Sequence, residues 1–301
     1  MRRILLEVEY HGQAFFGWQR QGPSRSVQAT LETAIADLVQ HEVAVHGAGR
    51  TDRGVHAKAM PAHVDIDSRL RCQELVMAIN ARLPQDCAVR TARQVDPRFH
   101  ARFDALRKLY RYRFYLSRAR SPLLADRACL VPRTIDLAAM HQAAALLVGT
   151  HDFLSFRTSP EHDQAVQPGA EHENDSDVTP DLHGPAAVAH GDFTPPPWRK
   201  PRPQGTTRTL FDVTLRTRNG LLNLDVHGDG FLRGMVRAIA GSLLEVGLGK
   251  QSPGWISTLL QARDRRLAGA NLPPHGLTLV SVDYPSEPLA GFDLEGAAAA
   301  P

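Results

Sequence analysis

The sequence predicts an α+β protein made of two related halves, each with the strand and helix order of a ferredoxin-like domain. Two observations lead to this prediction. Apolar residues alternate in some segments, which is typical of strands, and recur every third or fourth position in others, which is typical of helices. The order strand, helix, strand, strand, helix, strand occurs in the N-terminal part and resembles the order in the C-terminal part. The sequence identity between the two parts is too weak to indicate a repeat.

The first half, residues 1–105, begins with a strand whose alternate residues share one face: Ile4, Leu6, Val8 and Tyr10. A helix follows, with an apolar stripe at Val27, Leu31, Ile35 and Leu38. A second helix is predicted after Ser68, with its buried stripe at Cys72, Leu75, Val76 and Ile79. Residues 43–46 and 62–66 lie between these helices and have the composition of short strands.

The second half, residues 106–290, begins with a strand on which four apolar residues share a face: Tyr110, Tyr112, Phe114 and Leu116. Arg111 and Arg113 face the other way. A helix is predicted from about residue 136 to 149, and strands over residues 209–216 and 221–227.

The rest of this half predicts two helices and a closing strand. The helix over residues 231–246 has an inward stripe at Met235, Ile239, Leu243 and Val246. Gly247 is expected to end it. Ser252 and Pro253 have the character of an N-cap and a first-turn proline, and therefore predict another helix. The last strand alternates Thr278, Val280, Val282 and Tyr284.

Residues 160–205 differ in composition from both halves. The segment holds nine of the chain's 21 prolines, and eight acidic residues against three basic ones. It shows no apolar periodicity, so we expect a disordered insertion that cannot bury enough surface to offset its ordering entropy. Its histidines lack the spacing of metal ligands: His162, His172, His183 and His190. Residues 291–301 are expected to form a flexible tail.

The remainder of the chain is basic, with 32 Lys and Arg against 24 Asp and Glu. This balance favours a polyanionic partner. Cys72, Cys87 and Cys129 form no CxxC pair, which suits a reducing compartment and argues against a disulfide or zinc scaffold. No run of about 18 apolar residues occurs, and Glu7 and Glu9 interrupt the N-terminal stretch that a signal peptide would need. We therefore expect a soluble, cytoplasmic protein without a membrane span.

The most informative segment is Gly47-Ala-Gly-Arg-Thr-Asp-Arg-Gly-Val-His-Ala57. Its glycine spacing matches neither a P-loop nor a dinucleotide-binding fingerprint. It contains one carboxylate, Asp52, between Arg50 and Arg53, and these cations favour the ionised form of the carboxylate. Taken alone, the segment is also compatible with a solvated turn in which the aspartate pairs with an arginine.

This segment resembles the signature loop of the TruA family of tRNA pseudouridine synthases, which usually reads GAGRTDAGVHA. Ten of its eleven positions match, and Arg53 stands where the family normally has alanine. The first of the other similar blocks carries His11 in place of the usual aspartate. These blocks lie at residues 10–21, 99–105 with 110–112, 149–156, 231–247 and 273–284. The resemblance covers nearly the whole chain except the insertion and the tail.

The resemblance implies that Asp52 is the essential catalytic residue. It places Tyr110 beside the target base, where a ring replaces the stacking that a flipped uridine loses. It pairs Arg237 with the catalytic carboxylate, and Arg50 approaches the flipped nucleotide's place in the stack and its phosphates. From the residues alone, Tyr110 is more simply strand core, and Arg237 is more simply one of a solvated pair with Arg233.

Other basic residues form a dense run with interleaved aromatic residues, and as a set they suit the backbone of a folded RNA. This run comprises Arg98, Arg102, Arg107, Lys108, Arg111, Arg113, Arg118 and Arg120. A further set of histidines is expected to be structural rather than to supply general bases: His56, His63, His100 and His151.

The resemblance also implies a pseudouridine synthase fold, in which two ferredoxin-like halves form a continuous antiparallel sheet with helices on one face and RNA in the cleft between them. It implies isomerisation of uridines at tRNA positions 38, 39 and 40 in the anticodon stem-loop. It also implies a homodimer in which one tRNA contacts both subunits. The reaction breaks the N1–C1′ bond and rejoins the base through C5. No redox change or net group transfer occurs, so neither cofactor nor metal is expected. Asp52 has three open routes: addition to C1′, addition to C6, or removal of a sugar proton.

Two rival functions belong to other classes. A non-catalytic RNA-binding module of the same fold would bind tRNA without turnover, whether or not Asp52 is replaced. A metal-dependent RNA hydrolase would use a metal site made by His46, Asp52 and His56, would be sensitive to EDTA and would give cleaved product. The spacing of those three residues matches no recurrent ligand pattern, and no carboxylate cluster accompanies them.

Overall fold

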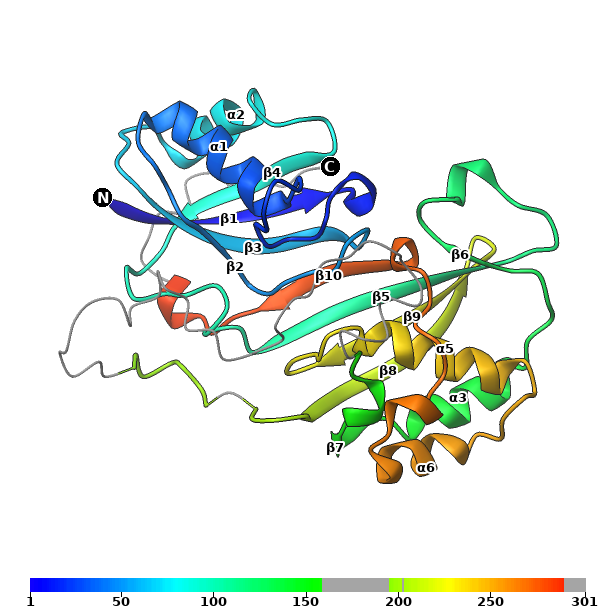
Figure 1. The fold of residues 1–301 in the computed structure, drawn as a ribbon. Helices are drawn as coiled ribbons and strands as arrows, with labels where there is room; N and C mark the ends of the chain where they lie inside the picture. The colour runs from blue at the N-terminus through cyan, green and yellow to red at the C-terminus, as the bar shows by residue number, and fades with distance from the viewer. Residues whose placement is uncertain (159–194, 202, 290–301) are drawn as a thin grey trace.

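The computed structural model describes residues 1–158, 195–201 and 203–289 of the chain. Within these residues the strands form one sheet with the path β4-β1-β3-β10-β5-β9-β8-β7, and β2 pairs with β3 and β6 with β5 off this path. Figure 1 shows the first half at the top and the second half below it, joined through the middle of the sheet. The predicted α+β class is confirmed.

The first half has the predicted element order: β1 (Arg2–Tyr10), α1 (Val27–Val39), β2 (Val45–Gly47), β3 (His56–Ile66), α2 (Cys72–Asn80) and β4 (Cys87–Gln94). Its strands adjoin in the order β4-β1-β3-β2, and every pair is antiparallel. The alternate residues predicted to share a face of β1 are all buried. Ser26 begins α1, because its hydroxyl accepts a hydrogen bond from the backbone N–H of Ala29 at 3.2 Å.

The second half repeats this arrangement with β5 (Arg107–Leu116), α3 (Leu137–Ala145), β8 (Thr207–Arg218), β9 (Leu221–Gly228), α5 (Met235–Gly247) and β10 (Leu277–Asp283). Its strands adjoin in the order β10-β5-β9-β8. The first, second, third and fourth strands of each half therefore occupy corresponding places. The described residues of this half also form β6 (Cys129–Val131), β7 (Gly149–Asp152) and α6 (Trp255–Ala262).

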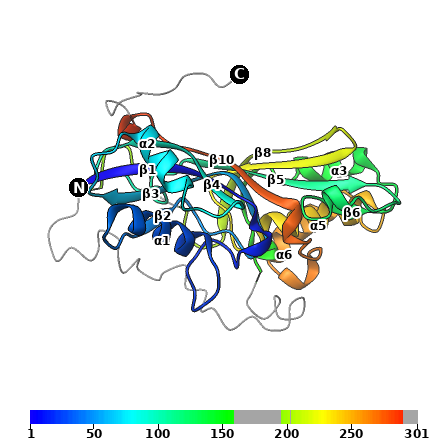
Figure 2. The same ribbon diagram turned by 90° about the horizontal axis from the view of Figure 1, so that it is seen from above.

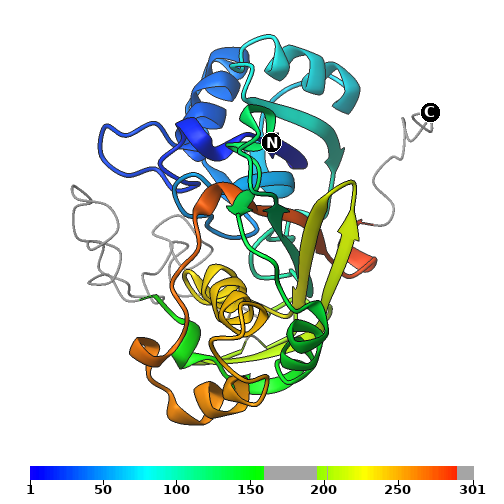
Figure 3. The same ribbon diagram turned by 90° about the vertical axis from the view of Figure 1, so that its right-hand side faces the viewer.

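The strand β10 joins the two halves. Thr278 and Leu279 pair in parallel with His56 and Ala57 of β3, while the other edge of β10 pairs antiparallel with β5. The sheet is mostly antiparallel, and the second parallel pair within it is β5 with β6. Figure 3 shows β10, in orange to red, running between the helices of the first half above and those of the second half below.

One hydrophobic core extends through both halves, and α5 lies deep within it. Every residue from Met235 to Leu243 of α5 is buried, so this helix has no solvated face over its first turns. Figure 2 shows α1, α5 and α6 on the same side of the sheet. The burial of α5 all round decides the environment of any charged residue that it carries.

The prediction for the start of α5 is wrong by one turn. The helix begins at Met235, because Gly234 adopts a left-handed conformation with φ of 67° that a helix cannot include. Phe231 therefore lies outside the helix, where its ring packs edge-on against Tyr110 with centroids 5.1 Å apart. At the other end, Gly247 is the last helical residue rather than the first one beyond the helix.

The predicted N-cap of α6 is also wrong. The helix begins at Trp255 after Gly254, and no side chain caps it. The carbonyl of Ser252 instead accepts a hydrogen bond from the N–H of Trp255 at 3.1 Å, so Ser252 and Pro253 form a turn ahead of the helix. The predicted helix from residue 136 is shorter than expected: α3 ends at Ala145, after which the chain turns into β7.

β3 is longer than the predicted strand over residues 62–66, since it begins at His56. Its first part includes Pro61, and proline cannot donate a hydrogen bond within a sheet. The carbonyl of Pro61 accepts from the N–H of Ala48 at 2.8 Å. The ring nitrogen of Pro61 points to the same edge as this carbonyl, and the pairing with β2 starts only at Ala62, so the missing N–H interrupts no ladder.

Of the predicted insertion, residues 160–194 and 202, with their four histidines, lie outside the described residues, as do residue 290 and the expected tail, residues 291–301. Residues 195–201 lie against the first half. Arg199 pairs with Asp104, whose side chain is fully buried, with Nε and Oδ1 2.5 Å apart. The guanidinium of Arg98 lies 4.9 Å from the ring centroid of Trp198.

All three cysteines are free thiols. Among residues 1–158, 195–201 and 203–289, no helix combines the length and the apolar character that crossing a bilayer requires.

Candidate active site

Asp52 lies in the loop that connects β2 to β3, residues 48–55. Its side chain is 33% exposed, so it is partly buried yet open to a substrate. The buried residues Thr51 and Val55 fix the loop on either side of it, whereas Arg50 and Arg53 are exposed. The loop therefore presents one carboxylate between two surface arginines, as the sequence predicted.

The block that opens the chain holds this loop in place. The backbone N–H of Trp18 donates to the carbonyl of Thr51 at 3.0 Å, and the N–H of Gly54 donates to the carbonyl of Phe15 at 3.3 Å. The hydroxyls of Tyr10 and Thr51 are hydrogen-bonded at 2.8 Å inside the core. These buried bonds fix the backbone on both sides of Asp52, which restricts where its carboxylate can point.

Close packing against Trp18 explains the first glycine of the loop. A Cβ atom on Gly47 would lie 2.5 Å from the indole ring of Trp18, a separation at which the ring or the loop would have to move. Trp18 itself is only 2% exposed and belongs to the main core. The similar blocks at residues 10–21 and 47–57 therefore form one packed unit.

Arg237 reaches Asp52 from α5. Its Nη1 atom lies 3.5 Å from Oδ2 of Asp52, and its Nε donates to the carbonyl of Leu272 at 2.7 Å. Arg237 is only 6% exposed, so the alternative of a solvated pair with Arg233 is wrong. The buried guanidinium is thus the counter-ion of this carboxylate. The bond to Leu272 fixes the direction in which the guanidinium points.

Tyr110 lies on β5 and also borders this carboxylate. It is 8% exposed and its ring contacts that of Phe231. Burial raises the pKa of Tyr110 well above its usual range, and the negative charge of Asp52 raises it further. The phenol therefore stays protonated at neutral pH. Tyr110 is strand core, as the residues alone suggested, and it lies close enough to Asp52 to sense its charge.

Arg50 is exposed two residues before Asp52. Within the part of the chain that the structure describes, it forms no ion pair with an acidic side chain. Its guanidinium is available to an anionic ligand. The structure thus brings Asp52, Tyr110 and Arg237 together and leaves Arg50 at the surface beside them.

Lys108 has a position that the sequence analysis missed. Its Nζ donates to the carbonyl of Ala48 at 2.8 Å and lies close to Gly49, so it connects β5 to the loop that carries Asp52. From the sequence, Lys108 was expected only to be one of the residues suited to an RNA backbone. The signal that could have distinguished it is its spacing, since residues 108 and 110 lie on the same face of a strand.

The basic run does not form a single surface. Arg111 lies on the opposite face of β5 from Tyr110 and makes a two-bond ion pair with Asp225, at 2.6 and 2.7 Å. Arg98 makes a similar pair with Asp96 at its own turn. Their charges are therefore partly compensated within the protein.

His56 connects three segments at the base of the loop that carries Asp52. Its Nδ1 accepts a hydrogen bond from the N–H of Gly12 at 3.0 Å, and its Nε2 lies 3.1 Å from the carbonyl of His275. Burial, followed by the nearby imidazole of His11, lowers the pKa of His56 to about 4. It is neutral at pH 7 and has the structural role that the sequence predicted.

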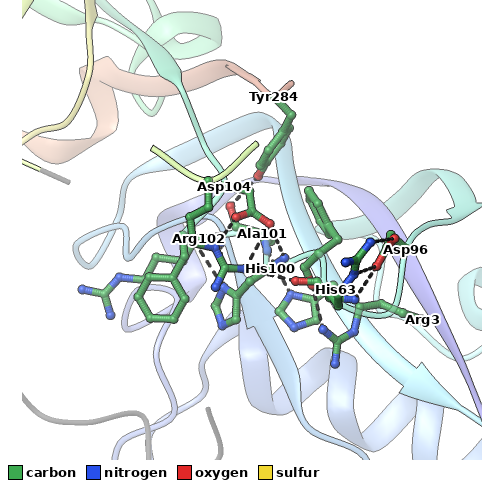
Figure 4. Close-up of polar contacts among 12 residues, drawn as sticks. Arg3, His63, Asp96, His100, Ala101, Arg102, Asp104 and Tyr284 are labelled. Atoms are coloured by element: carbon green, nitrogen blue, oxygen red, sulfur yellow. Dashed lines mark hydrogen bonds and ion pairs between the residues drawn. The ribbon is translucent and has the colours of Figure 1, made fainter. Parts of the chain in front are cut away.

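A histidine cluster made by His46, His63 and His100 lies behind the loop, where the rings of His46 and His63 stack 4.9 Å apart. Figure 4 shows His63 and His100 beside Ala101 and Asp104. His63 accepts from the N–H of Ala101 at 3.1 Å, and His100 accepts from that of Arg102. Burial is the largest cause that lowers the pKa of His63 well below its usual value and that of His100 to about 3.

The proposed metal ligands do not converge. His46 packs in the histidine cluster, whereas His56 packs against His11 with ring centroids 4.6 Å apart. In the part of the chain described, no group of three or more His, Cys, Asp or Glu side chains is arranged to hold a metal ion.

The family profile described as "tRNA pseudouridine synthase" matches residues 7–104 and 191–285 of the chain. The chain belongs to the tRNA pseudouridine synthase family. It is 41% identical over 295 residues to tRNA pseudouridine synthase A of Thermus thermophilus, covering 96% of this chain and 100% of that protein. It is 38% identical over 285 residues to the protein of the same name from Aliivibrio fischeri, covering 95% and 94%. The corresponding protein of Neisseria meningitidis is 39% identical over 285 residues, covering 94% and 92%.

The family assignment confirms the resemblance found in the loop and in the other blocks. As a tRNA pseudouridine synthase, the chain is an isomerase, and the pseudouridine synthase fold implied by the resemblance is confirmed. The matched residues include the loop with Asp52 in the first half and β8, β9, α5 and β10 in the second, so the profile spans both halves.

Proposed function

We propose that this tRNA pseudouridine synthase isomerises uridines at positions 38, 39 and 40 of the anticodon stem-loop, with Asp52 as its catalytic carboxylate. The observation that carries the proposal is the meeting of three side chains from separate elements around one point: Asp52 from the loop, Arg237 from α5 and Tyr110 from β5. These are the positions to which the family resemblance assigns the chemistry.

The reaction needs an ionised carboxylate that can reach the sugar or the base. The N1–C1′ bond breaks, the uracil turns, and a C5–C1′ bond forms; the C5 proton leaves and N1 gains a proton. Asp52 is open to the solvent on one side and faces the buried guanidinium of Arg237 on the other. A fixed carboxylate with its counter-ion already in place needs little reorganisation during the reaction.

Tyr110 is proposed to stack against the flipped uridine. Its ring is held by Phe231 and by the core, so it offers a fixed aromatic face. Because its pKa is raised, the phenol is a poor base at neutral pH. We therefore assign Tyr110 to positioning the base and not to removing the C5 proton. Arg50 is proposed to contact the phosphates of the flipped nucleotide.

A homodimer whose two subunits are bridged by one tRNA is part of the same proposal. It predicts a mass in solution twice that of the 33.1 kDa chain, measured by light scattering after size-exclusion chromatography. A monomer mass at the protein concentrations used for turnover would contradict it.

The test of the proposed function is tritium release from tRNA that carries C5-tritiated uridine, because every isomerisation must expel the C5 hydrogen. Wild type should release tritium, and Asp52→Asn should reduce release by a factor on the order of 100 or more while still binding tRNA. tRNAs with a uridine at only one of positions 38, 39 and 40 would test the site. Binding without release in both proteins would favour the RNA-binding module, and EDTA-sensitive cleavage would favour the hydrolase.

A further inference from the structure

Phe16 and Arg53 form a stacked pair at the outer edge of the catalytic loop. The ring of Phe16 is 48% exposed, whereas that of its neighbour Phe15 is 1% exposed and belongs to the core. The guanidinium carbon of Arg53 lies 4.2 Å from the centroid of the Phe16 ring. Since Arg53 directly follows Asp52, the pair lies at the side of the candidate active site.

The backbone fixes where this pair points. Gly17 adopts φ of 92°, and a Cβ atom there would lie 2.5 Å from the carbonyl of Thr51. The hydrogen bonds from Trp18 to Thr51 and from Gly54 to Phe15 lie on either side of the stacked pair. Both segments are therefore locked together, and the pair cannot move away from the loop without breaking buried contacts.

A second stacked pair nearby shows what is unusual about Arg53. Arg25 lies over Phe15 at 4.1 Å, and its guanidinium also makes two hydrogen bonds to Asp86, at 2.8 and 2.6 Å. Among the residues that the structure describes, no carboxylate pairs with Arg53 in this way. The two arginines share the same stacking, but within residues 1–158, 195–201 and 203–289 only Arg25 also pairs with a carboxylate.

Stacking on an aromatic face orients a guanidinium and leaves the N–H groups at its edge unused. Those groups form a planar fork that matches two oxygens of a phosphate. We propose that the Phe16–Arg53 pair binds a backbone phosphate of the RNA next to the nucleotide that enters the site at Asp52. The proposal rests on the proposed function, and it concerns a residue at which this chain departs from the usual alanine of the loop.

The test compares the salt dependence of tRNA affinity among wild type, Arg53→Ala and Arg69→Ala. Arg69 is an exposed arginine beyond the far end of β3, about 35 Å along the strand from the loop at the usual rise per residue, so its loss removes the same charge elsewhere. For Arg53→Ala we expect weaker binding and a slope of log affinity against log salt that is less negative by about 0.7 to 0.9, the value for one phosphate contact. Arg69→Ala should keep the slope of wild type.

The role of the ring is tested by Phe16→Leu and by the double variant with Arg53→Ala. If the ring acts by orienting the guanidinium, the double variant should bind tRNA no more weakly than Arg53→Ala alone. Strictly additive losses would overturn the pairing, and equal slopes for Arg53→Ala and Arg69→Ala would overturn the phosphate contact. Tritium release by wild type distinguishes these outcomes from failure of the proposed function. The proposed function predicts that wild type releases tritium whether or not Arg53 contacts a phosphate.

Discussion

The two halves share one strand order but differ in the connection between their second and third strands. In the first half, residues 48–55 connect β2 to β3 and carry Asp52. In the second half, β8 and β9 are joined only by Asn219 and Gly220, whose φ values of 52° and 74° are those of a tight hairpin turn. The same topological position thus holds the loop with Asp52 in one half and a two-residue turn in the other. The fold is repeated, but the proposed catalytic carboxylate occurs in only one of the two halves.

The second helices of the two halves, α2 and α5, also differ, and here it is the second half that carries the site residue. α2 is buried only along a stripe, and the ion pair between Arg71 and Glu74 at its start is at the surface. α5 is buried all round at its start and carries Arg237 into the site. The first half therefore supplies the carboxylate, while the second half supplies its counter-ion and the aromatic ring. Neither half contains a complete site.

The largest effect that would sharpen this comparison is expected from replacing the buried arginine. Arg237→Met should lower turnover by a factor on the order of 100 or more, because Asp52 loses its fixed counter-ion. Arg71→Met, which breaks the surface pair of α2, should leave turnover unchanged. Tritium release from saturating tRNA measures both. Methionine fills most of the space left by arginine, and Arg237→Lys restores the charge if the first variant unfolds. Turnover of Arg237→Met within about threefold of wild type would contradict the prediction.

An intermediate effect concerns acid stability, which should be set by the first half. The pKa of His100 is about 3 in the folded state, mainly because of burial, and lower than in an unfolded chain. Between these two pKa values the folded protein binds fewer protons than the unfolded chain. Its free energy of unfolding therefore decreases as the pH falls from about 6.5 towards 3. Each such histidine changes the free energy of unfolding by at most about 1.4 kcal/mol per pH unit.

Urea unfolding at several pH values would test this expectation. His100→Asn should reduce the pH slope of the unfolding free energy, whereas His141→Asn removes an exposed histidine of α3 without touching the cluster. The groups that lower the pKa of His100 besides burial are His46, Arg199, Arg3 and Arg102. An identical slope in wild type and His100→Asn would show that the cluster does not govern acid unfolding.

The smallest effect is expected at the hairpin turn of the second half. A side chain on Gly220 would meet no atom within 4 Å, so Gly220→Ala suffers only the strain of a positive φ. The free energy of unfolding should fall by about 1 kcal/mol, and tritium release should not change. Thermal unfolding and turnover together measure this. A loss of turnover would mean that the β8–β9 turn contributes to function after all.

The sequence alone predicted the fold class and most elements, because β1, α1 and β5 have clear apolar periodicity and their buried residues follow it. It failed where backbone conformation or long-range contacts decide. The start of α5 depends on the left-handed Gly234, and β3 begins at His56 although it includes Pro61, which has no N–H to donate. Asp52 could be singled out from its loop, although its catalytic role came from the family resemblance.

The rest of the candidate site could not be predicted from local pattern. The burial of Arg237 results from packing on all sides of α5, which a helical stripe does not reveal. The bond from Lys108 to the loop joins residues 60 positions apart. The pairing of Phe16 with Arg53 joins two loops, and neither loop has an apolar periodicity from which the contact could be predicted.

The position of β10 in the sheet has a consequence for the order of events on the ribosome. β10 is the last strand of the sheet in chain order, yet it is the one that touches both β3 and β5. The first half can be complete in the nascent chain long before residue 283 is added, since synthesis proceeds from the N-terminus. The carboxylate of Asp52 is then expected to stay exposed and without its counter-ion until the second half is synthesised and β10 pairs with both β3 and β5.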